Sequence, residues 1–343
     1  MNLDNNPPKR ARRRSGAVTL QDVAQLAGVA PITVSRALNT PAQVSSDLLR
    51  KVQDAVQRTG YVPNRMAGGL ASQRSRLIAA VVPSTVMSVF METIEALNTA
   101  LMDAGYQLML GQSNYAPERE TRLLEEVIAR RPDGIFLIGL LPSGASRTRL
   151  LASGIPVVET WDLGTSPMDM LVGFSHADIG RAAADFLIGK GRTRLTMVMA
   201  DDARAQRRFE AFAATVAQAG LPTVQVINVG SARDVHTGRQ ALTQLLAQAP
   251  DVDAVFCSSD LLALGVLTEA RVRSVAVPER LAILGFGDVP LVADLVPALS
   301  TVRINGAEIG RLSAEMLIAR AEGRNVDQPV VDVGFSIVER DST

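Results

Sequence analysis

Apolar and polar positions follow two different patterns along the chain. Within residues 18–59 the apolar side chains recur at helical spacing, as Leu20, Val23 and Ala27 do on one face of a predicted helix. From residue 77 onward, short continuous apolar runs alternate with amphipathic helical stretches. The runs are LIAAVV (77–82), YQLMLG (106–111), GIFLIG (134–139), PVVETW (156–161), LTMVMA (195–200), VQVINV (224–229), AVFCSS (254–259) and LAILGF (281–286). The pattern predicts a small helical domain followed by a large α/β body.

The body, residues 76–343, is predicted to contain parallel sheets. Helical stretches lie between most of the apolar runs, at 88–104, 117–130, 177–190, 204–219, 234–248 and 260–270. Continuous apolar strands that alternate with helices are typical of parallel sheets buried on both faces. Because about 260 residues is large for one sheet, we expect two lobes.

The first helix of the small domain is bounded by residues with strong end preferences. Thr19 is a good N-cap, and Asp22 follows it at the spacing of a capping box. Gly28 can adopt the left-handed conformation that ends a helix, and Pro31 suits the first position of the next one. A third helix is expected over about 45–58.

Two short helices joined at a glycine are the layout of a helix-turn-helix. The second helix of that motif enters the major groove of DNA, and here it leaves Thr33, Ser35 and Arg36 exposed. An ordinary amphipathic hairpin has the same periodicity, so periodicity alone does not decide. Charge favours DNA, because residues 1–65 hold ten lysines and arginines against four aspartates in a chain that is neutral at 35 against 35. Residues 1–17 are expected to be a disordered basic arm.

The segments VTLQDVAQLAGVAPITVSRALN (18–39) and YVPNRMAGGLASQRS (61–75) together resemble the head and hinge of the LacI, or lactose-repressor, family. The resemblance implies a helix-turn-helix domain over 18–63 and a hinge over 64–75. In that family the hinge forms a short helix only on operator DNA, where it pairs in the minor groove with the hinge of a second subunit. A leucine at the place of Leu70 wedges into the duplex there and bends it.

The resemblance also implies which residues contact DNA. The base-reading positions are occupied by Pro31 and Ile32, whose side chains can offer a base only apolar contact. Ala30 stands where family members often have serine, so a capping oxygen is missing. The expected DNA contacts are Thr19, Pro31, Ile32, Thr33, Ser35, Arg36, Asn39, Tyr61, Asn64, Arg65 and Leu70.

For the body, the resemblance implies the two-lobed fold of periplasmic sugar-binding proteins, which serves effector binding and dimerisation. We place three crossings between the lobes near 174–177, 303–305 and 333–335. The expected lobes are about 76–175 with 304–333, and about 176–303 with 334–343.

Ligands of open α/β sheets lie at the carboxyl ends of strands. The residues expected to contact an effector from such positions are Ser84, Trp161, Phe174, Ser259 and Asp288. By resemblance, Arg208 matches an arginine that points into the cleft, where a guanidinium can bind a carboxylate or neighbouring hydroxyls. The adjacent Arg204 and Arg207 are alternatives for the same role. Many sugar-responsive relatives have an aspartate where Gly287 stands, and its loss favours an anionic ligand.

The segments VVETWDL, DMLVGFSH, LGFGDV and LSTVRINGAEIGRLSAEML are most similar to the gluconate-utilisation repressors of the family. A sugar acid, gluconate or a close derivative, is therefore the expected effector, and a ketogluconate, a neutral sugar or a purine is the alternative. We expect a homodimer that binds a palindromic operator and releases it when the effector binds. The alternative is that the effector acts as a corepressor and strengthens operator binding.

Other classes of function have little support. No apolar run has the length of a membrane helix, and the basic N-terminus lacks the apolar segment of a signal peptide, so we expect a cytoplasmic, nucleoid-associated protein rather than an exported transport receptor. The single cysteine, Cys257, and the two histidines, His176 and His236, show no metal-ligand spacing. An α/β enzyme would need a catalytic constellation, and none is visible. We therefore expect no enzyme, no cofactor and no metal.

Overall fold

The computed structural model describes residues 18–62, 74–84, 89–141, 144–164 and 166–343. The chain divides into two units, Met1–Arg74 and Ser75–Thr343, which are described separately. The expected basic arm and most of the expected hinge, including Asn64, Arg65 and Leu70, lie outside the described residues.

Between residues 18 and 62 the N-terminal unit is helical. Its elements are α1 (Leu20–Ala27), α2 (Pro31–Asn39), the 3-10 helix η1 (Pro41–Gln43) and α3 (Ser46–Thr59). The predicted capping box is confirmed, since the Thr19 amide donates to Asp22 Oδ2 at 2.7 Å and the Thr19 side chain accepts from the Asp22 amide. Gly28 ends α1 at a φ of 68°. The three helices enclose a small core of Val23, Ala24, Val34, Ala37, Val52 and Ala55.

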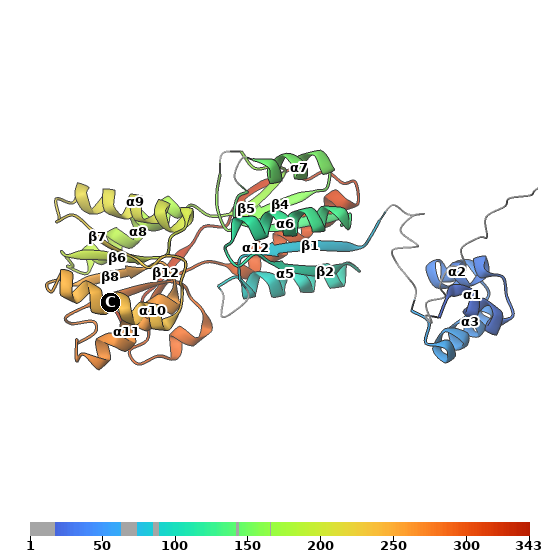
Figure 1. Ribbon diagram of the computed structural model, residues 1–343, viewed down its shortest axis with the longest axis horizontal. Coiled ribbons are helices and arrows are strands. Elements are labelled where there is room, and N and C mark those ends of the chain that lie inside the picture. Colours follow the sequence, from blue (N-terminus) through green and yellow to red (C-terminus); the bar gives the residue numbers. More distant parts are fainter. Residues whose placement is uncertain (1–17, 63–73, 85–88, 142–143, 165) are drawn as a thin grey trace, which may run out of the picture. The chain divides into compact units, whose positions relative to one another are not determined.

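The first sheet of the body is six-stranded and parallel, in the order β11-β5-β4-β3-β1-β2. Its strands are β1 (Leu77–Val82), β2 (Gln107–Gln112), β3 (Gly134–Ile138), β4 (Val157–Thr160), β5 (Met170–Gly173) and β11 (Val330–Asp332). The helices beside it are α5 (Met91–Asp103), α6 (Pro117–Ala129), α7 (Ala145–Ser153) and α12 (Gly306–Ala321). Alternate residues of β1 enter two different cores, Ile78 with α5 and α12, and Ala79 with α6 and α7. Both faces of this sheet are therefore covered, as Figure 1 shows.

The second sheet has the order β12-β10-β9-β8-β6-β7, in which β12 alone is antiparallel to its neighbour. Its strands are β6 (Leu195–Met199), β7 (Gln225–Asn228), β8 (Ala254–Cys257), β9 (Ala282–Gly287), β10 (Ser300–Arg303) and β12 (Ser336–Val338). The helices beside it are α8 (His176–Gly189), α9 (Ala203–Gln218), α10 (Val235–Gln248) and α11 (Asp260–Val272). The loop before β10 contains the 3-10 helix η2 (Pro290–Asp294).

The chain passes between the two sheets three times, from β5 to α8, from β10 to α12 and from β11 to β12. We call the part built on the first sheet lobe 1 and the part built on the second sheet lobe 2. The predicted fold class, a helix-turn-helix head with a two-lobed α/β body, is confirmed.

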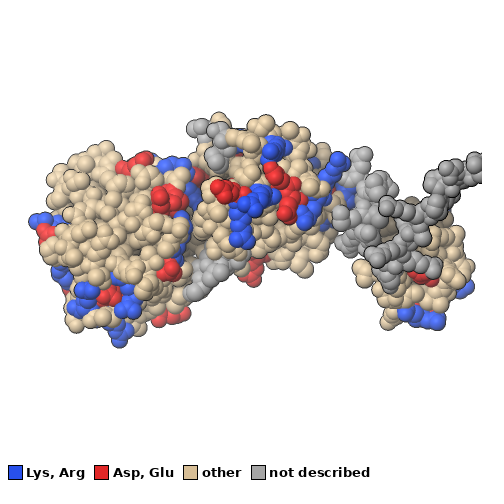
Figure 2. Space-filling view, viewed as in Figure 1, with Lys and Arg blue, Asp and Glu red and all other residues tan. Residues whose placement is uncertain are grey.

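Some elements of the body were not singled out by the apolar pattern. They are the helices α7 and α12 and the strands β5, β10, β11 and β12. Each of these four strands is only three or four residues long. Helix α12 was missed because it is buried on most sides, between the sheet and α5, so it lacks a clear polar face. Figure 2 shows basic and acidic side chains interspersed on the visible face of the body. None of the described helices has the length and apolar character that a membrane span requires.

Candidate functional site

The outer surface of α2 presents the residues expected to read DNA. Pro31, Arg36 and Asn39 are exposed, and Ile32 has 61% of its surface exposed although it is a large apolar residue. Thr33 and Ser35 are half-buried, and the Asn39 amide donates to Ser35 Oγ at 3.3 Å. The N-cap residue Ala30 makes no side-chain hydrogen bond, and the Thr33 amide donates to its carbonyl oxygen at 2.9 Å instead.

Two further residues expected at the DNA have other contacts within the unit. The Thr19 hydroxyl donates to Asp22 Oδ2 at 2.7 Å while its residue caps α1, so its side chain is committed to the helix end. Tyr61 is half-buried and packs against the core of the unit.

A cavity of about 320 Å³ lies in the body between residues of lobe 1 and lobe 2. Its apolar wall includes Phe90 and Trp161 from lobe 1 and Phe286 from lobe 2. The polar lining residues are Ser84, Tyr115, His176, Asp202, Arg204, Arg208, Ser231, Arg233, Asp234, Ser258, Ser259 and Asp260. Most of them follow a strand or begin a helix, which is where ligands of α/β sheets bind.

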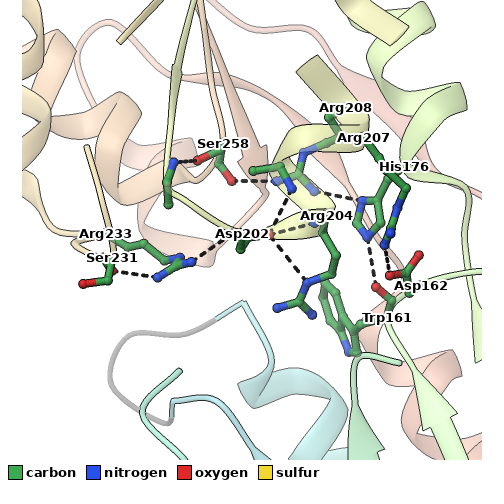
Figure 3. A network of polar contacts seen from close by, with 12 residues as sticks. Trp161, Asp162, His176, Asp202, Arg204, Arg207, Arg208, Ser231, Arg233 and Ser258 are labelled. Carbon is green, nitrogen blue, oxygen red and sulfur yellow. Dashed lines mark hydrogen bonds and ion pairs between the residues drawn. The ribbon is translucent and has the colours of Figure 1, made fainter. Parts of the chain in front are cut away.

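Three arginines of lobe 2 surround one aspartate in this cavity (Figure 3). Asp202 is the N-cap of α9, and its Oδ1 accepts from the amides of Arg204 at 3.0 Å and Ala205 at 2.9 Å. Its Oδ2 accepts from Arg233 Nη2 at 2.9 Å, and Arg204 Nε lies 3.9 Å from Oδ1. Arg208 comes from the next turn of α9. We call Asp202, Arg204, Arg208 and Arg233 the arginine cluster.

The arginine cluster has a positive excess. Burial alone would raise the pKa of Asp202, but Arg204, Arg208 and the hydrogen bonds outweigh burial and lower it to about 2. Burial lowers the pKa of Arg208 to about 10, so this guanidinium is still cationic at pH 7. Within the cluster three positive charges therefore face one negative charge, and solvent screens them poorly, while Asp234 and Asp260 line other parts of the same cavity. Such a cluster attracts an anion.

His176 links the arginine cluster to lobe 1. Its Nδ1 lies 2.8 Å from Arg208 Nη1, and its Nε2 lies 3.0 Å from the carbonyl oxygen of Trp161. Arginine can only donate and a carbonyl can only accept, so Nδ1 is the acceptor and Nε2 carries the proton. Burial and the nearby Arg208 lower the pKa of His176 well below its usual value, which agrees with a neutral ring.

Trp161 leaves β4 in an unusual conformation. Its φ is 62°, a left-handed value that is strained for a bulky residue. Its indole nitrogen donates to Thr93 Oγ1 at 3.1 Å, and its ring packs edge-on against Phe90 and Phe174. The aromatic wall of the cavity is thus held rigidly from behind.

A buried carboxyl group lies on another side of the cavity. Asp260 Oδ1 accepts from the Thr301 hydroxyl at 2.6 Å, and its Oδ2 accepts from the Val289 amide at 2.9 Å. Burial raises the pKa of Asp260 to about 6, despite these hydrogen bonds. Together with the nearby serines, this carboxylate can accept or exchange hydrogen bonds with ligand hydroxyl groups.

Contacts between the lobes also surround the cavity. Arg207 of α9 forms an ion pair with Asp162, which follows Trp161 in lobe 1. The guanidinium of Arg233 lies 3.8 Å from the ring centre of Tyr115. Lobe 2 therefore contacts lobe 1 through side chains of the same segments that build the arginine cluster.

Four of the six expected effector contacts line the cavity, namely Ser84, Trp161, Arg208 and Ser259. The other two, Phe174 and Asp288, do not line it, and this corrects those expectations. Phe174 is fully buried behind Trp161. The carboxylate of Asp288 turns away to form ion pairs with Arg303 and with Arg340. A position at a strand end therefore did not determine where these side chains point.

The cavity also contains residues that the sequence did not single out as contacts. Asp202, Arg233 and His176 are the important ones, and each lies shortly after a strand of the α/β pattern. That position was the available signal, but the pairing of these side chains depends on contacts between distant segments. Within the described residues, no group of three His, Cys, Asp or Glu residues could hold a metal ion.

A helix-turn-helix unit with an apolar-tipped second helix, joined in one chain to a two-lobed body with a ligand-sized cavity, defines a DNA-binding regulator with an effector domain. Comparison with known proteins agrees: residues 19–64 match the bacterial regulatory proteins of the lacI family, and residues 184–343 match a periplasmic binding protein-like domain. The chain belongs to the lacI family of bacterial regulatory proteins, which confirms the resemblance drawn from its head and hinge segments.

Similar proteins extend over nearly the whole chain. The HTH-type transcriptional regulator GntR of Pseudomonas aeruginosa is 40% identical over 96% of this chain and 97% of its own length. The regulator of the same name from Escherichia coli K12 is 32% identical over 93% and 96%. The crystal structure of a LacI-family transcriptional regulator from Silicibacter pomeroyi matches with a TM-score of 0.88 at 33% identity, covering 95% of this chain and 99% of that one. The protein is thus a DNA-binding transcriptional regulator and not an enzyme.

Proposed function

We propose that this protein is a repressor that binds a palindromic operator as a homodimer and releases it when a small sugar acid occupies the cavity of the body. Gluconate or a close derivative is the proposed effector. The observation that carries this proposal is the arginine cluster, in which three guanidinium groups face one carboxylate at the edge of the cavity between the lobes.

The cavity suits a small ligand that is charged at one end and hydroxylated along its length. Its volume of about 320 Å³ is near the lower end of ordinary ligand sites. A carboxylate beside the arginine cluster would gain charge-assisted hydrogen bonds, which are among the strongest in proteins. The remaining hydroxyl groups would meet Asp260, Ser258 and Ser259, while Trp161 and Phe90 cover an apolar face.

Arg204 is the member of the cluster that is least committed to the protein. Its guanidinium comes no closer to Asp202 than 3.9 Å, whereas Arg233 has hydrogen bonds to Asp202 and to the Ser231 carbonyl. We therefore expect Arg204 to turn toward a bound carboxylate with little cost.

On the DNA side, we propose that α2 enters the major groove. Pro31, Ile32 and Thr33 would lie against base edges, with Ser35, Arg36 and Asn39 beside them, while Thr19 and Tyr61 face the phosphate backbone. Asn64, Arg65 and Leu70 are proposed as hinge contacts in the minor groove. The position of Ile32 on the outer face of α2, where it is 61% exposed, is compatible with an apolar contact to a thymine methyl group.

Calorimetry on the full-length protein tests the effector. We compare gluconate with glucitol, which has the same carbon chain with a hydroxymethyl group in place of the carboxylate. Gluconate should bind at least tenfold more tightly, because a hydrogen bond to a charged group contributes about 1.5–3 kcal/mol. Equal affinity for both would indicate a neutral sugar ligand, and no binding of either would indicate another class, such as a ketogluconate or a purine.

A pair of arginine variants localises the binding. Arg204→Gln should lower gluconate affinity about tenfold and leave glucitol binding unchanged. Arg181→Gln is the matched control, since Arg181 lies on the exposed side of α8 in an ion pair with Asp178. Unaltered gluconate binding in Arg204→Gln would remove the arginine cluster from the effector site. Tighter operator binding with gluconate would make the ligand a corepressor.

A further inference from the structure

His176 occupies a position where the two lobes meet. It is the first residue of α8, directly after one of the three passages of the chain between the lobes, and only 3% of its surface is exposed. Its two ring nitrogens contact atoms from different lobes, Arg208 Nη1 in lobe 2 and the Trp161 carbonyl in lobe 1 (Figure 3). A histidine that only filled space would not need both contacts.

The two contacts are compatible with one state of the ring only. Nδ1 must accept from the arginine and Nε2 must donate to the carbonyl, so a second proton on the ring would face the guanidinium as donor against donor. Phe174 packs edge-on against the ring with centres 4.9 Å apart, and Phe286 lies 6.4 Å away. The ring is therefore fixed in both its tautomer and its orientation.

The contact with His176 also determines which donors of Arg208 remain for a ligand. Nη1 is taken by the histidine, and Nη2 has only a long contact of 3.4 Å to the Ser258 carbonyl. Among the described residues, the buried Nε of Arg208 has no hydrogen-bond partner. Nε and Nη2 form the side-on edge of the guanidinium, which can bind both oxygens of one carboxylate. Arg208 lines the cavity but is only 4% exposed, so a carboxylate could pair with this edge only after the side chain turns. Because an unpaired buried donor is costly, such a contact would be favourable.

On the lobe 1 side, the histidine holds a peptide group that is tied to lobe 2 a second time. The Trp161 carbonyl accepts from His176, and the next residue, Asp162, forms its ion pair with Arg207. Arg207 and Arg208 are neighbours on α9. His176 and Arg207 therefore connect two neighbouring residues of α9 to the same part of lobe 1.

We propose that His176 is a positioning residue with two separable roles: its Nδ1 arm orients Arg208 for the carboxylate of the effector, and its Nε2 arm transmits occupancy of the cavity to lobe 1. The proposal rests on the proposed function, since it assigns a task within the same effector site. The Nδ1 arm determines selectivity for an anionic ligand, and the Nε2 arm determines how strongly the ligand changes operator affinity.

Two conservative substitutions separate the arms. In His176→Asn the amide oxygen can take the place of Nδ1, but the side chain is too short to reach the Trp161 carbonyl. In His176→Gln the amide nitrogen can take the place of Nε2, while no acceptor remains near Arg208 Nη1. The measurements are calorimetry with gluconate and glucitol, and operator binding with and without gluconate, all on the full-length protein.

The two variants should fail in different ways. His176→Asn should keep the preference for gluconate over glucitol to within about threefold of the wild type, but lose most of the effect of gluconate on operator affinity. His176→Gln should lower gluconate affinity about tenfold while glucitol binding stays the same. Far-UV circular dichroism and urea unfolding of both variants, measured beside the wild type, show whether they fold.

Other outcomes overturn the proposal. Wild-type behaviour of both variants would show that His176 has no positioning role. If both variants lose gluconate affinity and the effect of gluconate on the operator to the same extent, or if each shows the effect expected of the other, the two roles are not separable as proposed. A failure of both variants to fold would show that His176 is a structural residue. If the wild-type protein does not bind gluconate, the proposed effector fails first, and that result is distinct from each of these.

Discussion

Replacing Asp202 with asparagine should destabilise the body while leaving its fold intact. The amide oxygen of asparagine can still cap α9, because it can accept from the Arg204 and Ala205 amides as Oδ1 does now. The substitution removes the negative charge among three arginines and places an amide N–H₂ group opposite Arg233. It therefore isolates the electrostatic contribution of the aspartate.

The size of the effect follows from the pKa of Asp202. That pKa falls from 3.8 to about 2 on folding, and 22% of the side chain is exposed, so solvent screening reduces the effect only in part. A shift of nearly two units corresponds to about 2 kcal/mol of stability. Because the pKa is lowered in the folded state, this stability is fully present above pH 3.8 and is lost as the pH falls toward 2.

Urea unfolding followed by tryptophan fluorescence measures this difference. The chain has one tryptophan, Trp161, which is 2% exposed and lies in lobe 1, so the signal reports the body and not the head. Asp234→Asn is the matched control, because Asp234 lines the same cavity and caps α10 through the Thr237 amide. Among the described residues no ion pair joins it to the arginine cluster. The free energy of unfolding of the wild type should exceed that of Asp202→Asn by about 2 kcal/mol from pH 5 to 8. An equal decrease in the free energy of unfolding in the two variants, or no decrease in either, would show that the charge of Asp202 does not stabilise the body.

Three other expectations follow from local geometry. Ala30→Ser should supply the missing cap of α2 and slow amide exchange in that helix about fivefold, equivalent to about 1 kcal/mol, and unchanged exchange would contradict it. Gly173→Ala should cost more than about 4 kcal/mol or prevent folding, because the added Cβ would lie 1.9 Å from the Asp162 carbonyl oxygen, whereas Gly189→Ala, with open space around it, should be tolerated in the same urea assay. Burial raises the pKa of the Cys257 thiol, so alkylation at pH 8 should occur only after unfolding, and rapid labelling of the folded protein would contradict the burial.

Local chemistry explains why the head could be predicted from its sequence in detail. The capping pair Thr19 and Asp22, the left-handed Gly28 and the initial Pro31 each act over a few residues, and each is found where the pattern placed it. The long strands of the body were predictable for a similar reason, because a strand buried on both faces is apolar throughout. Short strands at the sheet edges, such as β11 and β12, contain too few residues to produce a pattern.

The cavity was predictable only in part, because its chemistry depends on pairs of distant residues. Arg208 was expected through resemblance, but its partner His176 lies 32 positions away, and nothing in either segment indicates the other. The same holds for Arg233 and Asp202, which are 31 positions apart. Asp288 follows a strand as expected, but its carboxylate forms ion pairs with Arg303 and Arg340, and the residue does not line the cavity.

We propose above that a sugar acid bound in the body controls the affinity of the protein for its operator. It is tested most directly by fluorescence anisotropy of the full-length protein on a labelled palindromic operator, selected from random-sequence DNA, during titration with gluconate and in parallel with glucitol. Gluconate should weaken operator binding by about 5- to 150-fold, and glucitol should leave it unchanged. Operator affinity that stays constant across the gluconate titration would contradict it.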